Sequence, residues 1–63
     1  MSVSQFVNEY LITEACRLLR ETDETVLAIS LAAGFATKSN FNREFPRVTG
    51  QTPSQWRSAN KAS

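Results

Sequence analysis

The sequence has no histidine, one cysteine (Cys16), and only two glycines and two prolines among its 63 residues. A single thiol excludes a disulfide framework, and without histidine an ordinary zinc site cannot be built from this chain alone. The commonest general base is therefore missing, and there is no glycine-rich phosphate loop, so the sequence argues against an enzyme and implies no cofactor. These absences point to binding rather than catalysis.

Long apolar runs are absent as well. The longest stretch without a charged residue, from Thr25 to Thr37, is too short and too rich in alanine, serine and threonine to cross a bilayer. No signal peptide is recognisable, since the first residues are polar and lack a basic segment. We therefore expect no membrane partner and a cytoplasmic location, which a reduced thiol fits.

The charge of the chain is divided unevenly along its length. Residues 1–25 carry two arginines against five carboxylates, a net charge of −3, whereas residues 26–63 carry five basic residues against Glu44 alone, a net charge of +4. The overall charge of +1 conceals this difference. A basic second half suits a polyanionic partner.

Hydrophobic spacing and helix-capping residues predict an all-α fold. Apolar residues three and four apart predict a helix over residues 3–21. Its expected apolar face consists of Val3, Phe6, Val7, Tyr10, Leu11, Ala15, Leu18 and Leu19. A second helix is expected over 26–33, between an N-cap at Thr25 and a left-handed Gly34. Thr52, Pro53 and Gln55 predict the start of a fourth helix over 53–60.

The third predicted helix, over residues 38–48, has two unlike faces. Phe41, Phe45 and Val48 form an apolar stripe, and polar residues with Pro46 fall roughly opposite. Proline lacks the N–H that would bond the Asn42 carbonyl, so Pro46 either bends this helix or ends it. The spacing of Phe45 and Val48 favours a bent helix that continues.

These features together resemble the DNA-binding domain of AraC/XylS-type transcription regulators. The resemblance rests on "VLAISLAAGF" (26–35), "FNREF" (41–45) and "GQTP" (50–53), with "A15…LL" in the first helix. It implies a homeodomain-like fold, in which residues 1–24 form a helix linking two helix-turn-helix units, 25–50 form the second unit, and 51–63 form a C-terminal helix and tail. The 63 residues are then a single domain or half-domain. The upstream helix-turn-helix and an effector domain would belong to the parent protein. "SVSQFV" (2–7) and "TPSQWR" (52–57) support this arrangement, because they share a pattern.

The resemblance also assigns a DNA-reading surface to the third helix. Base contacts map onto Lys38, Ser39, Asn42 and Arg43, while Thr37 and Arg47 flank this face and suit phosphates. Arginine pairs with guanine and asparagine with adenine in the major groove, so the residue types fit. A merely solvated helix face is the simpler interpretation of the polar pattern alone.

Other notable residues have simpler interpretations. Arg57 and Lys61 are expected to be ordinary solvated charges, and Cys16 a small buried hydrophobic residue. Four aromatic residues fit a core better than a stacking platform for single strands: Phe35, Phe41, Phe45 and Trp56.

The function predicted is sequence-specific binding of double-stranded DNA within an AraC-type regulator, at the prokaryotic nucleoid when bound. Leu11 and Pro46 stand where family members usually carry a basic residue, which should weaken phosphate attraction. The alternatives are a small helical protein-interaction module and an inactive fragment without DNA binding of its own. The salt dependence of binding distinguishes DNA binding from protein interaction, since DNA binding weakens steeply as the salt concentration rises and apolar docking barely responds.

Overall fold

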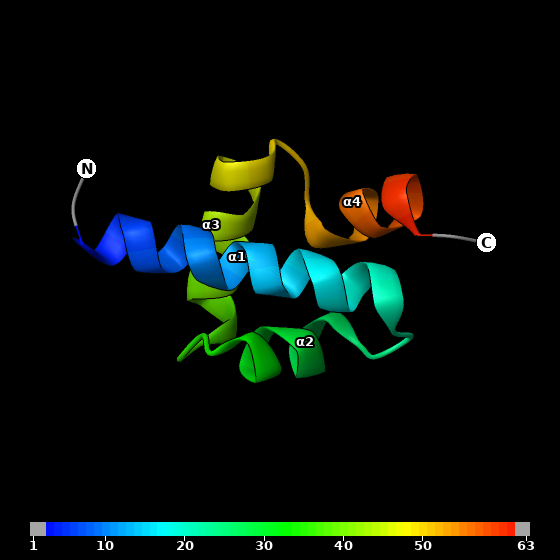
Figure 1. Ribbon diagram of the computed structural model, residues 1–63, viewed down its shortest axis with the longest axis horizontal. Helices are drawn as coiled ribbons and strands as arrows, with labels where there is room; N and C mark the ends of the chain where they lie inside the picture. The colour runs from blue at the N-terminus through cyan, green and yellow to red at the C-terminus, as the bar shows by residue number, and fades with distance from the viewer. Residues whose placement is uncertain (1–2, 62–63) are drawn as a thin grey trace.

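The computed structural model describes residues 3–61, which form four helices: α1 (Val3–Glu21), α2 (Val26–Ala33), α3 (Lys38–Thr49) and α4 (Pro53–Asn60). The predicted all-α fold is confirmed, with α3 one residue longer than expected. The long helix α1 runs through the middle of the molecule, and the other three helices pack around it (Figure 1). The three principal dimensions are 37 × 20 × 16 Å.

The helix boundaries are set by capping residues. Thr25, Thr37 and Thr52 each accept a hydrogen bond from the backbone N–H three residues later, at 3.1–3.2 Å. Gln55 Oε1 in turn accepts a bond from the backbone N–H of Thr52, which completes a capping box. At the other ends, Gly34 (φ 110°) and Gly50 (φ 80°) adopt the left-handed conformation that glycine tolerates. The predicted caps at Thr25 and Thr52 are confirmed.

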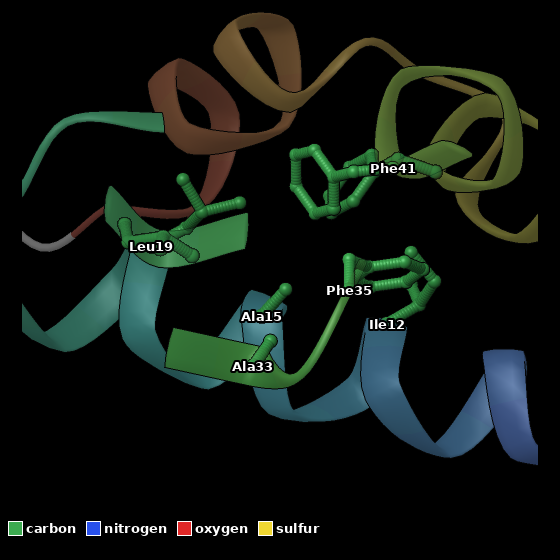
Figure 2. Close-up of a cluster of buried hydrophobic side chains, with 8 residues drawn as sticks. Ile12, Ala15, Leu19, Ala33, Phe35 and Phe41 are labelled. Carbon is green, nitrogen blue, oxygen red and sulfur yellow. The ribbon is translucent and has the colours of Figure 1, made fainter. Parts of the chain in front are cut away.

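The core consists of side chains from α1, α2, α3 and the α2–α3 turn (Figure 2). Its buried side chains are Ile12, Ala15, Leu19, Ile29, Ala33, Phe35, Phe41 and Phe45. Edge-to-face and tilted ring contacts continue this core toward α4, with ring centres 5.2, 5.4 and 6.3 Å apart, from Phe35 to Trp56. Phe35, Phe41 and Phe45 are therefore core residues, as predicted, and Trp56 packs half-buried against them.

The predicted apolar face of α1 is wrong in its first half. Val3, Phe6, Val7 and Tyr10 are exposed, with 67% of Phe6 and 68% of Tyr10 accessible. The physical reason is phase, because a turn of 100° per residue places Val3, Phe6, Val7 and Tyr10 on nearly the opposite side of α1 from the buried Ile12, Ala15 and Leu19, away from the other helices.

Residues at the edge of the core also differ from expectation. Val48 was expected in the buried stripe and is 36% exposed. Cys16 is half-buried against the core, where burial raises the pKa of its thiol. Leu11, at a position where the family usually has a basic residue, packs partly buried against the same core.

The structure decides between the two interpretations of Pro46. Helix α3 contains Pro46 and continues to Thr49, so the proline does not end the helix. The Pro46 carbonyl accepts a 2.8 Å bond from the N–H of Gly50, which shows that the following turn is intact. Pro46 lies on a partly exposed face, where water can reach the unpaired Asn42 carbonyl.

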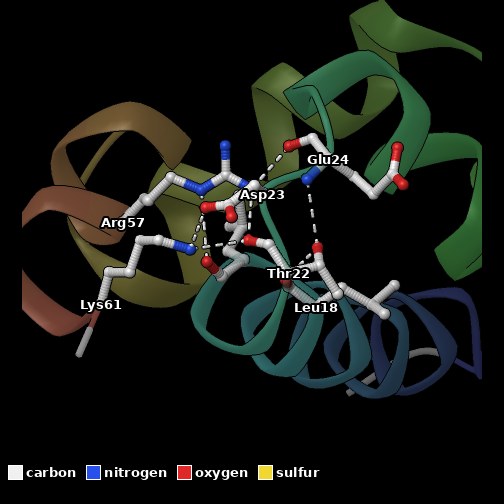
Figure 3. Close-up of polar contacts among 7 residues, drawn as sticks. Leu18, Thr22, Asp23, Glu24, Arg57 and Lys61 are labelled. Carbon is white, nitrogen blue, oxygen red and sulfur yellow. Dashed lines mark hydrogen bonds and ion pairs between the residues drawn. The ribbon is translucent and has the colours of Figure 1, made fainter. Parts of the chain in front are cut away.

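Arg57 and Lys61 are not ordinary solvated charges, which corrects the prediction. The Arg57 guanidinium donates to the carbonyls of Leu19 (3.2 Å) and Glu24 (2.6 Å), and Lys61 Nζ donates to the carbonyl of Thr22 (2.9 Å) (Figure 3). The carbonyls at the end of a helix lack partners inside it, so cations are favoured there. Lys61 also pairs with Asp23 at 2.7 Å and thereby lowers the pKa of that carboxyl.

Candidate nucleic-acid interface

Helix α3 presents one buried and one exposed face. Phe41 and Phe45 are fully buried on the inner face. The four predicted base-contacting residues are all exposed on the outer face: Lys38, Ser39, Asn42 and Arg43. Helical periodicity places them side by side, so the structure brings these predicted residues together.

The turn between α2 and α3 fixes the direction of the exposed face. The backbone N–H of Phe35 donates to the Ser30 carbonyl at 3.1 Å, and the buried Phe35 ring packs at 71° to Phe41. Ser30 is fully buried, and its hydroxyl donates to the Leu27 carbonyl at 2.7 Å, so it brings no unpaired polar group into the core. A side chain at Gly34 would be strained by the φ of 110°, and its Cβ atom would also lie 3.2 Å from Leu11 Cδ2, which would have to shift slightly.

The two predicted phosphate-contacting residues differ in their surroundings. Thr37 is exposed and caps α3, so its hydroxyl lies at the positive end of the helix dipole. Arg47 is held by the protein, because its Nε and one terminal nitrogen lie 3.1 and 2.9 Å from Glu44 Oε1. Arg47 is nevertheless 39% exposed, so the guanidinium reaches solvent.

Sequence reasoning missed two residues that contact the predicted arginines. Asn40 Oδ1 accepts a 2.8 Å bond from the Arg43 guanidinium. Glu44 is buried, pairs with Arg47, and lies 3.7 Å from Arg43 Nε. Hydrogen bonding to Arg47 lowers the pKa of Glu44 although burial opposes this. Arg43 with Asn40 and Arg47 with Glu44 are each three residues apart, about one helical turn. This spacing could have predicted both contacts from the sequence.

Residues 3–61 have one small hollow, but they have neither a cluster of metal ligands nor a membrane-spanning helix. Residues 3–61 contain no group of three or more side chains that could hold a metal ion, and no helix in that range is long and apolar enough to cross a membrane. A hollow of about 270 Å³ between α1 and α2 has a single carboxylate in its lining, which consists of Leu18, Glu24, Ala28, Ile29 and Ala32.

Comparison with known proteins places this geometry in a family. A family model described as a helix-turn-helix domain matches residues 1–59. The chain is 39% identical over 57 residues to the HTH-type transcriptional activator RhaR of Salmonella heidelberg and of Salmonella typhi, and 37% identical to that of Salmonella arizonae. Each match covers 90% of this chain and 20% of the relative, so the chain spans about a fifth of the length of these curated relatives. No solved structure matches.

The match extends across all four helices, and it agrees with the short helix, glycine turn and outward-facing helix seen in the structure. The resemblance read from the sequence is therefore confirmed. The family consists of transcription regulators rather than enzymes, and its helix-turn-helix implies DNA binding. The chain belongs to the AraC-type helix-turn-helix family of transcription regulators.

Proposed function

We propose that this chain binds double-stranded DNA sequence-specifically, with α3 as the recognition helix in the major groove. The observation that carries the proposal is the exposed polar face of α3, whose opposite face is fixed in the core by Phe41 and Phe45. A helix held in this way can enter a major groove without disturbing the fold, since the groove accepts one helix.

Within this face, each side chain has a role that suits its chemistry. Arg43 suits bidentate contact with guanine and Asn42 with adenine, while Lys38 and Ser39 reach neighbouring base edges. Arg43 is 76% exposed, so its guanidinium has room to meet a base. Thr37 and Arg47 contact phosphates on either side, and these contacts fix the position of the helix on the duplex.

The proposal extends to the organisation of the parent protein. Residues 1–24 are the segment, with α1 as its helix, that links two helix-turn-helix units; residues 25–50 are the second unit, and residues 51–63 are its C-terminal segment with α4. The upstream unit covers the exposed apolar half of α1, and an effector domain lies elsewhere in a cytoplasmic regulator. The pattern shared by residues 2–7 and 52–57 supports this, because Phe6 then matches Trp56, which packs edge-on against Phe45.

Replacing Arg43 tests the assigned reading face. Duplexes would be selected from a random pool with the 63-residue chain at low salt, and then compared with scrambled versions. Arg43→Ala is expected to remove about 1–3 kcal/mol of discrimination, the value of one bidentate base contact. Arg20→Ala is the matched control, because Arg20 is also an exposed helical arginine but lies on α1. Equal loss in both variants, or unchanged discrimination in Arg43→Ala, would contradict the assignment.

Salt dependence tests the two alternatives. Affinity of the chain for duplex should be weak and should fall linearly with the logarithm of salt concentration, by a slope of about −0.9 per neutralised phosphate. A protein-interaction module would bind through the exposed apolar half of α1 and respond little to salt. An inactive fragment would show no duplex binding even at low salt.

A further inference from the structure

Glu44 is the one charged residue that is buried in the described part of the chain, residues 3–61. Only 10% of its side chain is exposed, at the place where α3 meets α1. Three nitrogens converge on its Oε1: Asn8 Nδ2 from α1 at 3.2 Å, and two Arg47 nitrogens at 3.1 and 2.9 Å. Arg43 Nε lies 3.7 Å from Oε2.

The negative charge of the Glu44 carboxylate opposes the electrostatic attraction between α3 and the phosphates of DNA. It lowers the positive potential of the α3 surface, and phosphate attraction rises with the number of cationic groups that neutralise phosphates. If bulk charge alone determined binding, removing Glu44 should therefore strengthen it. The contacts of Glu44 suggest a different effect.

Glu44 bonds one edge of the Arg47 guanidinium and leaves the other edge to solvent. The bonds use Nε and one terminal nitrogen, so the hydrogen bonds and ion pairs of Arg47 within residues 3–61 do not use the second terminal nitrogen. Arginine presents its donors in a rigid planar fork, so holding one edge fixes the direction of the other. Asn8 holds the carboxylate from α1, which ties this direction to the scaffold rather than to α3 alone.

We propose that Glu44 is a positioning residue of the DNA interface: its carboxylate, anchored by Asn8, holds Arg47 with its free edge toward a DNA phosphate and restrains Arg43 beside it. This inference rests on the proposed DNA-binding function. A side chain ordered before binding loses less conformational freedom when the complex forms, so the restraint favours affinity. The lowered pKa of Glu44 keeps the carboxylate ionised, and the restraint in place, at neutral pH.

The test compares two variants with the same change in net charge. Glu44→Gln removes the carboxylate at the interface. Glu14→Gln removes one from α1, where Glu14 accepts bonds from Nε and a terminal nitrogen of Arg17 in the same one-turn geometry. Each protein would be titrated with a short duplex of arbitrary sequence at low salt. We expect Glu14→Gln to bind as tightly as the parent or slightly more tightly, and Glu44→Gln to bind about tenfold more weakly, the size of one charged hydrogen bond.

Asn8→Ala is the second variant, since it leaves every charge in place. It should weaken duplex binding by a smaller factor than Glu44→Gln while the circular dichroism spectrum stays that of the parent. The Arg47 Nε–H resonance, followed by NMR, supplies a readout that a purely structural Glu44 would not affect. In the parent and in Glu14→Gln this resonance should exchange slowly with water and shift when duplex is added, and in Glu44→Gln it should do neither.

The outcomes separate this inference from the function on which it rests. Absence of duplex binding by the parent chain overturns the proposed function, and the inference with it. Binding by the parent, with Glu44→Gln as tight as Glu14→Gln, overturns the positioning role alone. Weaker binding by Glu44→Gln with an unchanged Arg47 response to duplex also overturns it, because the loss would then have another cause.

Discussion

The two halves of α1 both carry apolar residues three and four apart, but these residues lie on different sides of the helix and in different environments. In the second half, Ile12, Ala15 and Leu19 are almost completely buried among the other helices. In the first half, Val3, Phe6, Val7 and Tyr10 repeat the spacing on nearly the opposite side of the helix, and they are exposed. Asn8 lies near the boundary, where it reaches Glu44 of α3.

This comparison separates two kinds of information. Hydrophobic period specifies that a segment is helical and which of its faces avoids water. It does not place two apolar stretches of one helix on the same side, since that depends on their relative phase around the helix axis. Helices α2, α3 and α4 cover the side of α1 that carries Ile12, Ala15 and Leu19, and they leave the side with Phe6 and Tyr10 open.

The largest effect should come from truncating one apolar residue in each half. Leu19→Ala is expected to lose about 2–5 kcal/mol, which approaches the whole stability of so small a domain, and therefore to abolish the cooperative melt. Phe6→Ala, a larger truncation, should change the free energy of unfolding by no more than about 0.5 kcal/mol. Thermal and urea melts followed by circular dichroism measure both. Similar losses in the two variants would show that the halves of α1 do not differ as described.

A smaller loss of stability should follow from removing the hydrogen bonds that Arg57 of α4 makes to the C-terminal end of α1 and the residues after it. Arg57→Ala leaves the carbonyls of Leu19 and Glu24 without their charged donor and should lose about 1–3 kcal/mol. Arg20→Ala is the matched control on the exposed side of α1 and should be nearly neutral. Urea melts at neutral pH measure the difference. A neutral Arg57→Ala would mean that water replaces the guanidinium without cost.

The smallest effect is a pH dependence of stability that comes from Glu44, the residue that Asn8 contacts near the middle of α1. The pKa of Glu44 in the folded chain lies below its usual value of 4.5, so its pairing stabilises the fold above that pH and is lost as the pH falls further. Glu14 and Asp23 are shifted in the same direction, so the parent should weaken in acid for several reasons. Glu44→Gln should show a shallower loss of melting temperature below pH 4.5 than the parent. Parallel acid profiles would contradict a paired Glu44.

The fold was predictable largely because local residues determine where each helix starts and stops. The threonine caps and the left-handed glycines act through backbone geometry within a few residues, so Thr25, Gly34 and Thr52 could be read directly from the sequence. Pro46 was harder, because its effect depends on whether the unpaired carbonyl faces water or the core. The spacing of Phe45 and Val48 favoured a continuing helix, although Val48 proved only partly buried.

The residues of the candidate site were less predictable where their environment depends on distant segments. Arg57 is separated by 38 residues from Leu19, whose carbonyl it binds, and no local pattern indicates that contact. Asn8 and Glu44 are likewise 36 residues apart. The exposure of Lys38, Ser39, Asn42 and Arg43 follows from one helical period and was predictable, whereas their roles on DNA stay a prediction.

The bonds from Arg57 and Lys61 to the end of α1 also affect the order of folding during synthesis. They close loops of 33 to 39 residues, so the carbonyls of Thr22 and Glu24 have their side-chain partners only after nearly all of the described chain has been made. Helix α1 can form earlier, because its own bonds are local. A nascent chain that stops before α4 would therefore have an α1–α2 connection whose carbonyls still lack the donors that Arg57 and Lys61 supply.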